Sequence, residues 1–278
     1  MAALRFDAFG HDASEVLNVG YAQSGYVLQT KKSTRWGGSI VETQVSCFDG
    51  TKKCATPATL SWRLPKPFGF SFVDIDKLEL DRAGKCKLDA SFANACGVPG
   101  LKVDVRFPVE DLSKAAIGCT YANLRPFLFR LDCPARSPGS FRGEVTCAPV
   151  RGAHLGAKFT SEGGIPDLAL RLSSGRLAII LGARVSQGAL GTSAFLRVSP
   201  HFRYAASLGF SATHGLSSTT LGMVYKNVYR VKVAHSTREV DIAGSVLFPV
   251  SKGISLLGGV RYGVKQGHLS WGLALKLE

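Results

Sequence analysis

The sequence predicts an all-β membrane barrel, built as an up-and-down meander of hairpins behind one short helix. Large apolar residues alternate with small or polar ones in segments that recur every ten to fifteen residues or so, from about residue 25 to the C-terminus. Short turn signals, such as SPGS at 137–140 and SSG at 173–175, separate these segments. No apolar run approaches the roughly 20 residues of a membrane helix, so the chain either avoids the bilayer or crosses it as a closed barrel.

The first twenty residues are expected to form an amphipathic helix. Apolar residues recur with the spacing of one helical face: Phe6, Phe9, Ala13, Val16 and Leu17. The remaining positions are mostly polar or charged, and include Arg5, Asp7, His11, Asp12, Ser14 and Glu15. These acids disfavour an anionic membrane surface and favour a net-basic barrel lumen. We therefore predict a helix lodged in the pore over 1–20, and a single barrel domain over 21–278.

The C-terminal segment shows the strand pattern most clearly. In HLSWGLALKLE, residues 268–278, Trp271 and the four leucines share one parity, and every charge has the other. A soluble β-sandwich would also alternate in this way. The many predicted strands are evenly spaced along the sequence, and aromatic residues lie near the ends of their apolar faces; both features favour the barrel.

Composition restricts the function. The chain has 34 Lys and Arg against 20 Asp and Glu, a net charge of +14, which indicates anionic partners such as nucleic acid, acidic lipid or permeating anions. The seven cysteines form no CxxC pair, so we expect reduced thiols and no metal. No catalytic or nucleotide-binding motif is present, so we expect neither an enzyme nor a cofactor. The N-terminus lacks the apolar core of a secretory signal, which counts against a bacterial outer-membrane origin.

Several segments together resemble the mitochondrial porins, the voltage-dependent anion channels of the outer membrane. FDAFGHDASEVLNVGY at 6–21 is similar to the family's N-terminal helix, and GLK at 100–102 matches a signature that opens a middle strand. FSATHGLSSTTLGMVYK at 210–226 and SKGISLLGGVRYG at 251–263 resemble late strands. The resemblance implies about 19 strands, with the first and last strands parallel, because the family is the odd-numbered exception among barrels.

The resemblance also assigns roles to residues. The last strand looks like the signal read by the assembly machinery of the outer membrane, carried by Ser270, Gly272, Leu273, Leu275 and Leu277. Nucleotide-contact positions would be Asp241, Ile242, Ala243, Gly259, Arg261 and Gly263. Where the family's helix usually carries Lys or Arg, this chain has His11, Ser14 and Val19, so its helix is net acidic.

Asp74 is exceptional because it continues the parity of Phe68, Phe70 and Phe72, which would place an acid on the apolar face. Animal members of the resembled family carry a membrane-facing glutamate at this place, linked to gating and dimerisation. A strand that has already ended would instead place Asp74 in a turn, and both interpretations stay open at the level of sequence.

With the barrel assigned, the polar parity becomes the lining of the pore. The inward bases are expected to be Lys102, Arg106, Arg130, Arg142, Lys158, Arg171, Arg184, Arg197, Lys226, Arg230, Lys232, Arg261 and Lys276. Seven acids share that face: Asp104, Asp132, Glu144, Asp167, Glu239, Asp241 and Glu278. An excess of positive charge in a wide tube concentrates anions.

The polar parity predicts a diffusion channel that prefers anions. The resemblance implies that this channel is voltage-dependent and weakly selective, lies in the mitochondrial outer membrane and passes nucleotides, phosphate, carboxylates and ions. The expected partners are the bilayer, the permeating anions, the assembly machinery and, in an oligomer, further copies of the chain. An outer-membrane protein-import pore of the same fold is the first alternative, although it should show acidic patches for basic presequences. A soluble basic β-protein that binds nucleic acid is the second, although it would cluster its basic residues on one face.

Overall fold

The computed structural model describes residues 3–21, 25–34, 37–45, 58–67, 72–81 and 84–277. In the described residues one sheet has 19 strands. The strands are β1 (Gly25–Thr34), β2 (Gly37–Val45), β3 (Ala58–Pro65), β4 (Val73–Asp81), β5 (Cys86–Ala93), β6 (Leu101–Pro108), β7 (Ala116–Tyr121), β8 (Phe127–Pro134), β9 (Arg142–Val150), β10 (Ala153–Thr160), β11 (Asp167–Ser174), β12 (Leu177–Arg184), β13 (Ala189–Arg197), β14 (Phe202–Ser211), β15 (Gly215–Tyr225), β16 (Tyr229–Ser236), β17 (Val240–Ser251), β18 (Ile254–Gly263) and β19 (His268–Leu277).

The helical elements are short. The α-helix α1 (His11–Asn18) follows the 3-10 turn η1 (Phe6–Ala8), and further 3-10 turns lie between strands: η3 (Ala95–Gly97), η4 (Leu112–Lys114) and η5 (Val185–Gln187). In the described part of the chain, no helix is both long enough and apolar enough to span a membrane.

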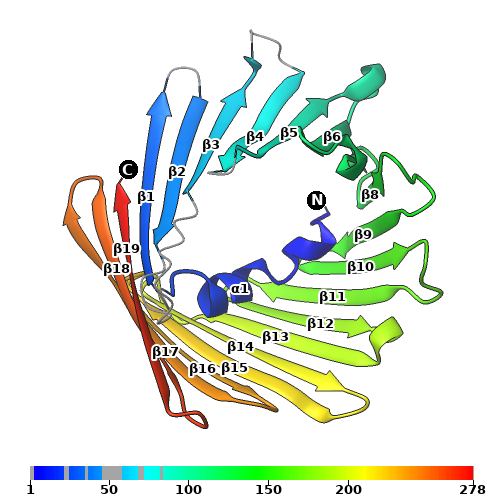
Figure 1. Cartoon of the computed structure of the whole chain (residues 1–278). Helices are drawn as coiled ribbons and strands as arrows, with labels where there is room; N and C mark the ends of the chain where they lie inside the picture. Colours follow the sequence, from blue (N-terminus) through cyan, green and yellow to red (C-terminus); the bar gives the residue numbers. More distant parts are fainter. Residues whose placement is uncertain are drawn as a thin grey trace.

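Each strand pairs antiparallel with the next one along the chain, and β1 pairs in parallel with β19. Leu28 of β1 stands opposite Leu275, and the ring of Tyr26 lies edge-on to Trp271 at 5.8 Å across the same pair of strands. The order of pairing thus returns to its start, and Figure 1 shows the strands arranged around a central space. The predicted β-meander behind one N-terminal helix is confirmed.

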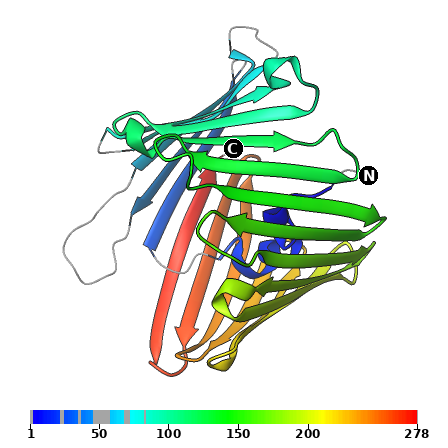
Figure 2. The same cartoon turned by 90° about the vertical axis from the view of Figure 1, so that its right-hand side faces the viewer.

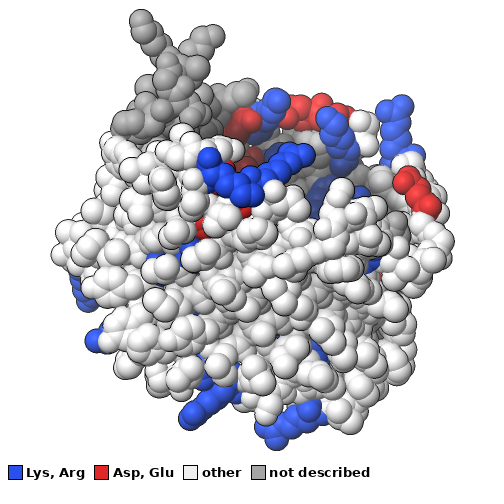
Figure 3. Space-filling model, turned by 90° about the horizontal axis from the view of Figure 1, so that it is seen from below, with Lys and Arg blue, Asp and Glu red and all other residues white. Residues whose placement is uncertain are grey.

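Alternation along each strand separates the two faces of the sheet. In β12, Leu177, Ile179 and Leu181 are exposed, whereas Ala178 and Ile180 between them are buried. The same rule leaves Leu269 63% and Trp271 40% exposed on the outer face of β19. Figure 2 shows the strands from the side, tilted across the wall, and Figure 3 shows a broad outer surface with little charge. The period of two therefore produces an apolar outside.

The N-terminal helix lies inside the ring (Figure 1). Its residues Ala13, Val16 and Leu17 are buried, and they form one core with four wall residues: Ala178, Phe195, Ala205 and Val224. Phe9 is also buried. Burial of the side chains of Phe9, Val16 and Leu17 stabilises the docked segment by about 1.5–3 kcal/mol each. Ile180 lines the same hollow as Phe6 and Phe9. Leu128 is also buried in the wall.

Two glycines of the wall make room for the helix. A Cβ atom on Gly156 would lie 2.7 Å from the ring of Phe6, and one on Gly222 would lie 2.8 Å from Leu17. Real Cβ atoms do not approach other atoms so closely, so a side chain at either position would push the N-terminal segment away from the wall.

No disulfide joins the cysteines that the structure describes. Cys86, Cys96, Cys119, Cys133 and Cys147 are free thiols, and Cys47 and Cys54 lie outside the described residues.

The structure corrects both interpretations of Asp74, which lies within β4 rather than in a turn and does not face the membrane side. Asp74 stands opposite Ser91, and Ser91 stands opposite Asp104, whose carboxylate contacts Arg130 on the inner face. Residues directly opposite each other share a face, so Asp74 belongs to the inner one. Its Oδ1 accepts a hydrogen bond from the backbone N–H of Lys66 at 3.0 Å. The strand β4 begins only at Val73, so the parity of the residues that precede it does not carry into the strand.

We predict that Gly222→Leu displaces the helix. The new side chain would overlap Leu17, and the overpacking should cost about 1–3 kcal/mol. The thermal midpoint in detergent should fall, and protease should cut residues 3–20 more readily. Gly191→Leu is the matched control, because a Cβ atom there meets nothing within 4 Å. Equal behaviour of the two variants would contradict the docked position.

Candidate functional site: the charged inner wall

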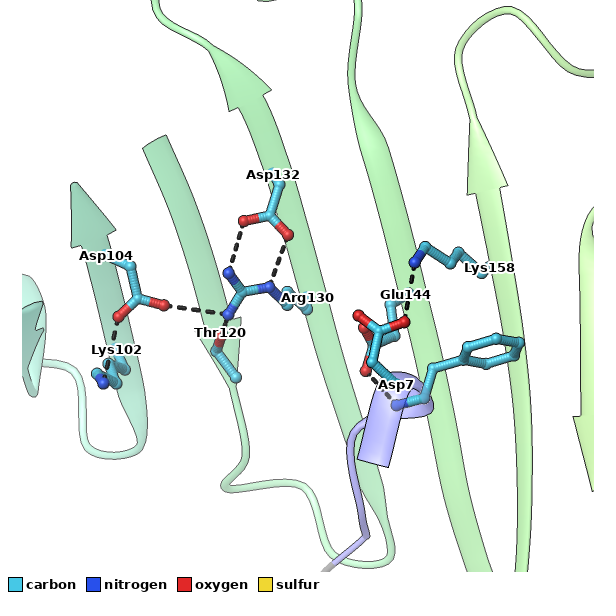
Figure 4. Close-up of polar contacts among 9 residues, drawn as sticks. Asp7, Lys102, Asp104, Thr120, Arg130, Asp132, Glu144 and Lys158 are labelled. Atoms are coloured by element: carbon cyan, nitrogen blue, oxygen red, sulfur yellow. Dashed lines mark hydrogen bonds and ion pairs between the residues drawn. The ribbon is translucent and has the colours of Figure 1, made fainter. Parts of the chain in front are cut away.

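The inner wall binds the first turn of the N-terminal segment through two polar contacts. Lys158 Nζ on β10 lies 3.0 Å from Asp7 Oδ1. The backbone N–H of Phe6 donates to Glu144 Oε1 on β9 at 2.6 Å. Figure 4 shows both contacts side by side between the two strands. Together they fix the chain before the helix begins.

Arg171 on β11 binds the start of the helix with both terminal nitrogens of its guanidinium group. Nη1 donates to the carbonyl oxygen of Phe9 at 2.5 Å, and Nη2 donates to Asp12 Oδ2 at 2.6 Å. The Arg171 side chain is 12% exposed. Hydrogen bonds of charged groups are worth about 1.5–3 kcal/mol when shielded from water, so this arginine is a principal anchor.

Three further bases bind the second half of the segment. Arg203 on β14 pairs with Glu15 at 2.9 Å, while Arg230 and Lys232 on β16 donate to the carbonyl oxygens of Val19 and Leu17 at 2.9 and 3.1 Å. The last carbonyls of a helix lack partners within it and carry partial negative charge. Cations from the wall therefore cap the C-terminus of α1.

Hydrogen bonds fix the course of the chain directly after the helix. Ser245 Oγ on β17 donates to the carbonyl oxygen of Gly20 at 2.7 Å, and Tyr21 Oη donates to that of Val16 at 3.2 Å. Lys232 Nζ lies 4.5 Å from the centre of the Tyr21 ring. Burial raises the pKa of Tyr21 to about 12, so the hydroxyl remains a donor at neutral pH.

A second group of charges is neutralised within the wall. Arg130 on β8 is almost fully buried and makes two bonds of 2.6 Å to Asp132, one of 3.0 Å to Asp104 and one of 3.0 Å to Thr120 (Figure 4). Lys102 lies 3.2 Å from Asp104. This cluster has equal numbers of positive and negative groups, so it contributes little net field to the central space.

Five other predicted bases face inward and form no ion pair within the part of the chain that the structure describes: Arg106, Arg142, Arg184, Arg197 and Lys276. Arg5 of the N-terminal segment is also exposed on the inner side of the ring. After the anchors and the Arg130 cluster are accounted for, positive charge remains available to solutes.

Lys226 departs from the predicted inner set. It lies in the turn after β15, with a positive φ of 50°, and its Nζ stands 5.3 Å from the centre of the Tyr225 ring. Because Tyr225 shares the outward parity of Leu221 and Met223, Lys226 belongs to the rim. Conversely, sequence reasoning missed Arg203, although the alternation of 203–211 would have placed it inward.

The predicted nucleotide-contact residues lie on the neighbouring strands β17 and β18 but do not all share a face. Arg261 Nη2 pairs with Asp241 Oδ2 at 2.8 Å, so these two neutralise each other. Ile242 is 44% exposed on the outer face, which contradicts its inclusion. Ala243, Gly259 and Gly263 have the inward parity of Arg261.

The other predicted positions are placed as follows. His11 is exposed on the helix, and Ser14 Oγ accepts a hydrogen bond from Asn18. On β19, Leu273, Leu275 and Leu277 have the outward parity of Trp271, while Ser270 and Gly272 have the inward one. Among the described residues, no group of His, Cys, Asp or Glu is arranged to hold a metal ion.

The comparisons with known proteins support the fold alone. No family description and no curated sequence matches this chain. Among solved structures, a porin of Rhodopseudomonas blastica carrying three substitutions is similar, with a TM-score of 0.51 and 10% identity over 87% of this chain and 96% of that chain. The chain therefore has a porin-like fold.

We predict that Arg171→Met loosens the start of the helix. The variant loses the bonds to Asp12 and Phe9, and since Asp12 is 37% exposed, the loss should be about 1–2 kcal/mol. Amide hydrogens of residues 11–18 should exchange roughly tenfold faster in detergent. Arg184→Met removes the same charge from the next strand without touching the helix. Unchanged exchange in Arg171→Met, or an equal rise in both variants, would refute the anchoring role.

Proposed function

We propose that this chain forms a water-filled pore in a membrane and that small solutes, anions preferentially, diffuse passively through it. One observation carries the proposal: the sheet is apolar outside and charged inside, and several inward bases, such as Arg184 and Arg197, form no ion pair with the residues that the structure describes. An apolar band on a strand-built wall suits lipid, because every strand finds its hydrogen bonds within the sheet. The porin-like fold supports the same interpretation.

The expected solutes are ions, phosphate, carboxylates and nucleotides. Passage needs no tight binding and no chemical step, which is consistent with a wall whose strongest polar groups are already paired. The charge preference should be weak, because Asp7, Asp12 and Glu15 of the N-terminal segment neutralise three of the inward bases. We therefore propose neither an enzymatic activity nor a cofactor.

The location and the regulation are further parts of the proposal. The resemblance of the helix and of the last strand to mitochondrial porins supports the mitochondrial outer membrane, with Ser270, Gly272, Leu273, Leu275 and Leu277 as the assembly signal. Voltage dependence is proposed because the N-terminal segment carries charged groups inside the ring and is held by ion pairs rather than by the backbone ladder.

The alternatives are less consistent with the charges. An import pore for basic presequences should present acidic surfaces, whereas the described acids Asp104, Asp132 and Asp241 are paired with arginines. A soluble protein that binds nucleic acid should gather its bases on its outer surface, whereas most of the bases discussed above point into the ring.

We predict that the purified chain in planar bilayers with a gradient of potassium chloride gives large conductances that fall at high voltage. The reversal potential should favour chloride, because unpaired inward bases raise the local concentration of anions. A protein that stays soluble without detergent would contradict the membrane proposal, and a reversal potential that favours potassium would contradict the role of the bases.

We predict further that Arg184→Glu with Arg197→Glu shifts the reversal potential toward potassium. Both residues face inward and change the field inside the pore, whereas Lys226 lies at the rim over Tyr225. The single variants Arg197→Glu and Lys226→Glu carry the same change of charge and provide a matched pair. The inner substitution should have the larger effect, and a larger effect of Lys226→Glu would overturn the assignment of faces.

A further inference from the structure

A hollow of about 470 Å³ lies at one end of the ring, between the N-terminal segment and strands β6 to β10. Its lining includes Ala116 at the start of β7, Pro134 at the end of β8, Arg142 at the start of β9 and Thr160 at the end of β10. These strand ends belong to the same rim, because neighbouring strands run in opposite directions. The hollow is therefore at a mouth and is open to solutes that enter there.

In this hollow, most of the acids already have a partner within the protein, whereas most of the bases have none among the described residues. Five bases line it, namely Arg5, Arg106, Arg130, Arg142 and Lys158, against four acids, Asp7, Asp132, Glu144 and Glu162. Asp132 is bound by Arg130, Asp7 by Lys158, and Glu144 by the backbone N–H of Phe6. Glu162 lies on the exposed turn after β10. Three of the acids are thus already partnered inside the protein.

Three guanidinium groups are left, those of Arg5, Arg106 and Arg142. Within the described residues none of them forms an ion pair or a side-chain hydrogen bond, although Asp89 stands opposite Arg106 and Asp132 opposite Arg142 in the register. They come from three elements, the N-terminal segment, β6 and β9, and they line one hollow. The hydroxyl-bearing residues Thr160 and Ser161 line it too.

This set of donors matches a multiply charged oxyanion. A guanidinium presents a planar fork of N–H groups that binds phosphate or carboxylate with two parallel hydrogen bonds. Several forks directed into one space can bind several anionic groups of one molecule, and the volume is within the range of small-molecule sites. A single chloride ion would use only a part of these donors.

We propose that Arg5, Arg106 and Arg142 form a binding site for oxyanions that carry two or more phosphate or carboxylate groups, at one mouth of the pore. The site rests on the proposed function for its physiological meaning, since it would hold the anion at the entrance. Its position makes the two ends of the pore unequal: a polyanion added from the side of this hollow blocks conductance at lower concentration than one added from the other side.

The first experiment measures binding without conductance. The full chain in nonionic detergent is titrated with inorganic tripolyphosphate, and separately with citrate, by calorimetry. Arg106→Gln with Arg142→Gln should lower the affinity about tenfold for each guanidinium, or roughly 100-fold together. The matched control is Arg184→Gln with Arg197→Gln, which removes the same charge elsewhere on the inner face and should change the affinity by about threefold at most at physiological salt.

Arg106→Lys with Arg142→Lys keeps the charge and removes the forks, so it tests the geometry in a variant close to the natural chain. It should retain part of the affinity and lose more for tripolyphosphate and citrate than for chloride. A preference between the two probes identifies phosphate or carboxylate as the natural group. Absence of binding, or equal losses in the Arg106/Arg142 and Arg184/Arg197 variants, would overturn the site.

The second experiment separates the site from the channel function. In planar bilayers, tripolyphosphate should reduce conductance from one side preferentially, and the Arg106/Arg142 double variant should abolish that asymmetry. A protein that binds tripolyphosphate through these arginines but forms no pore would refute the proposed function and leave the site standing. A pore that prefers chloride but does not bind tripolyphosphate through these arginines would refute the site and leave the proposed function standing.

Discussion

A β-strand turns successive side chains to opposite faces, and both surfaces of this molecule depend on that constraint. In β12, three exposed apolar residues alternate with Ala178 and Ile180, which are buried under the N-terminal segment. Because the pairing of strands passes from β1 through every neighbour and back through β19, residues that stand opposite each other share a face, and each strand has an outer and an inner side. A shift of one residue in any strand would move its charges outward and its leucines inward.

The inner face then determines where the N-terminal segment can lie. That segment has one apolar stripe and an acidic remainder, so it needs a surface that offers both apolar contact and bases. The wall provides the two side by side: Phe195 and Val224 contact the stripe, and Arg171 and Arg203 bind Asp12 and Glu15. An exposed ion pair alone is worth little, but here each pair adds to buried apolar contact and to bonds with backbone carbonyls.

Alternation made the strands and the inner face predictable over the second half of the chain, where the runs are long and regular. The errors fall where the period is interrupted. Asp74 continues the parity of the three phenylalanines that precede it, but β4 begins only at Val73, so that parity does not carry into the strand. Lys226 was placed inward, although a turn ends the strand one residue earlier. The pairing of the acidic helix with particular bases was beyond prediction, since it depends on contacts such as Glu15 with Arg203, 188 residues apart.

The net charge of the chain overstates the field that a solute meets. Lys158, Arg171 and Arg203 are neutralised by helix carboxylates, and Arg130 and Arg261 by aspartates of the wall. What remains is a smaller set of arginines that have no ion pair among the described residues, unevenly placed, with Arg5, Arg106 and Arg142 lining one hollow at the rim of the ring. In a pore of this kind, anion preference would depend on which bases lack partners rather than on how many there are. It follows that release of the acidic helix would increase the exposed positive charge, because Lys158, Arg171 and Arg203 would lose their carboxylates together.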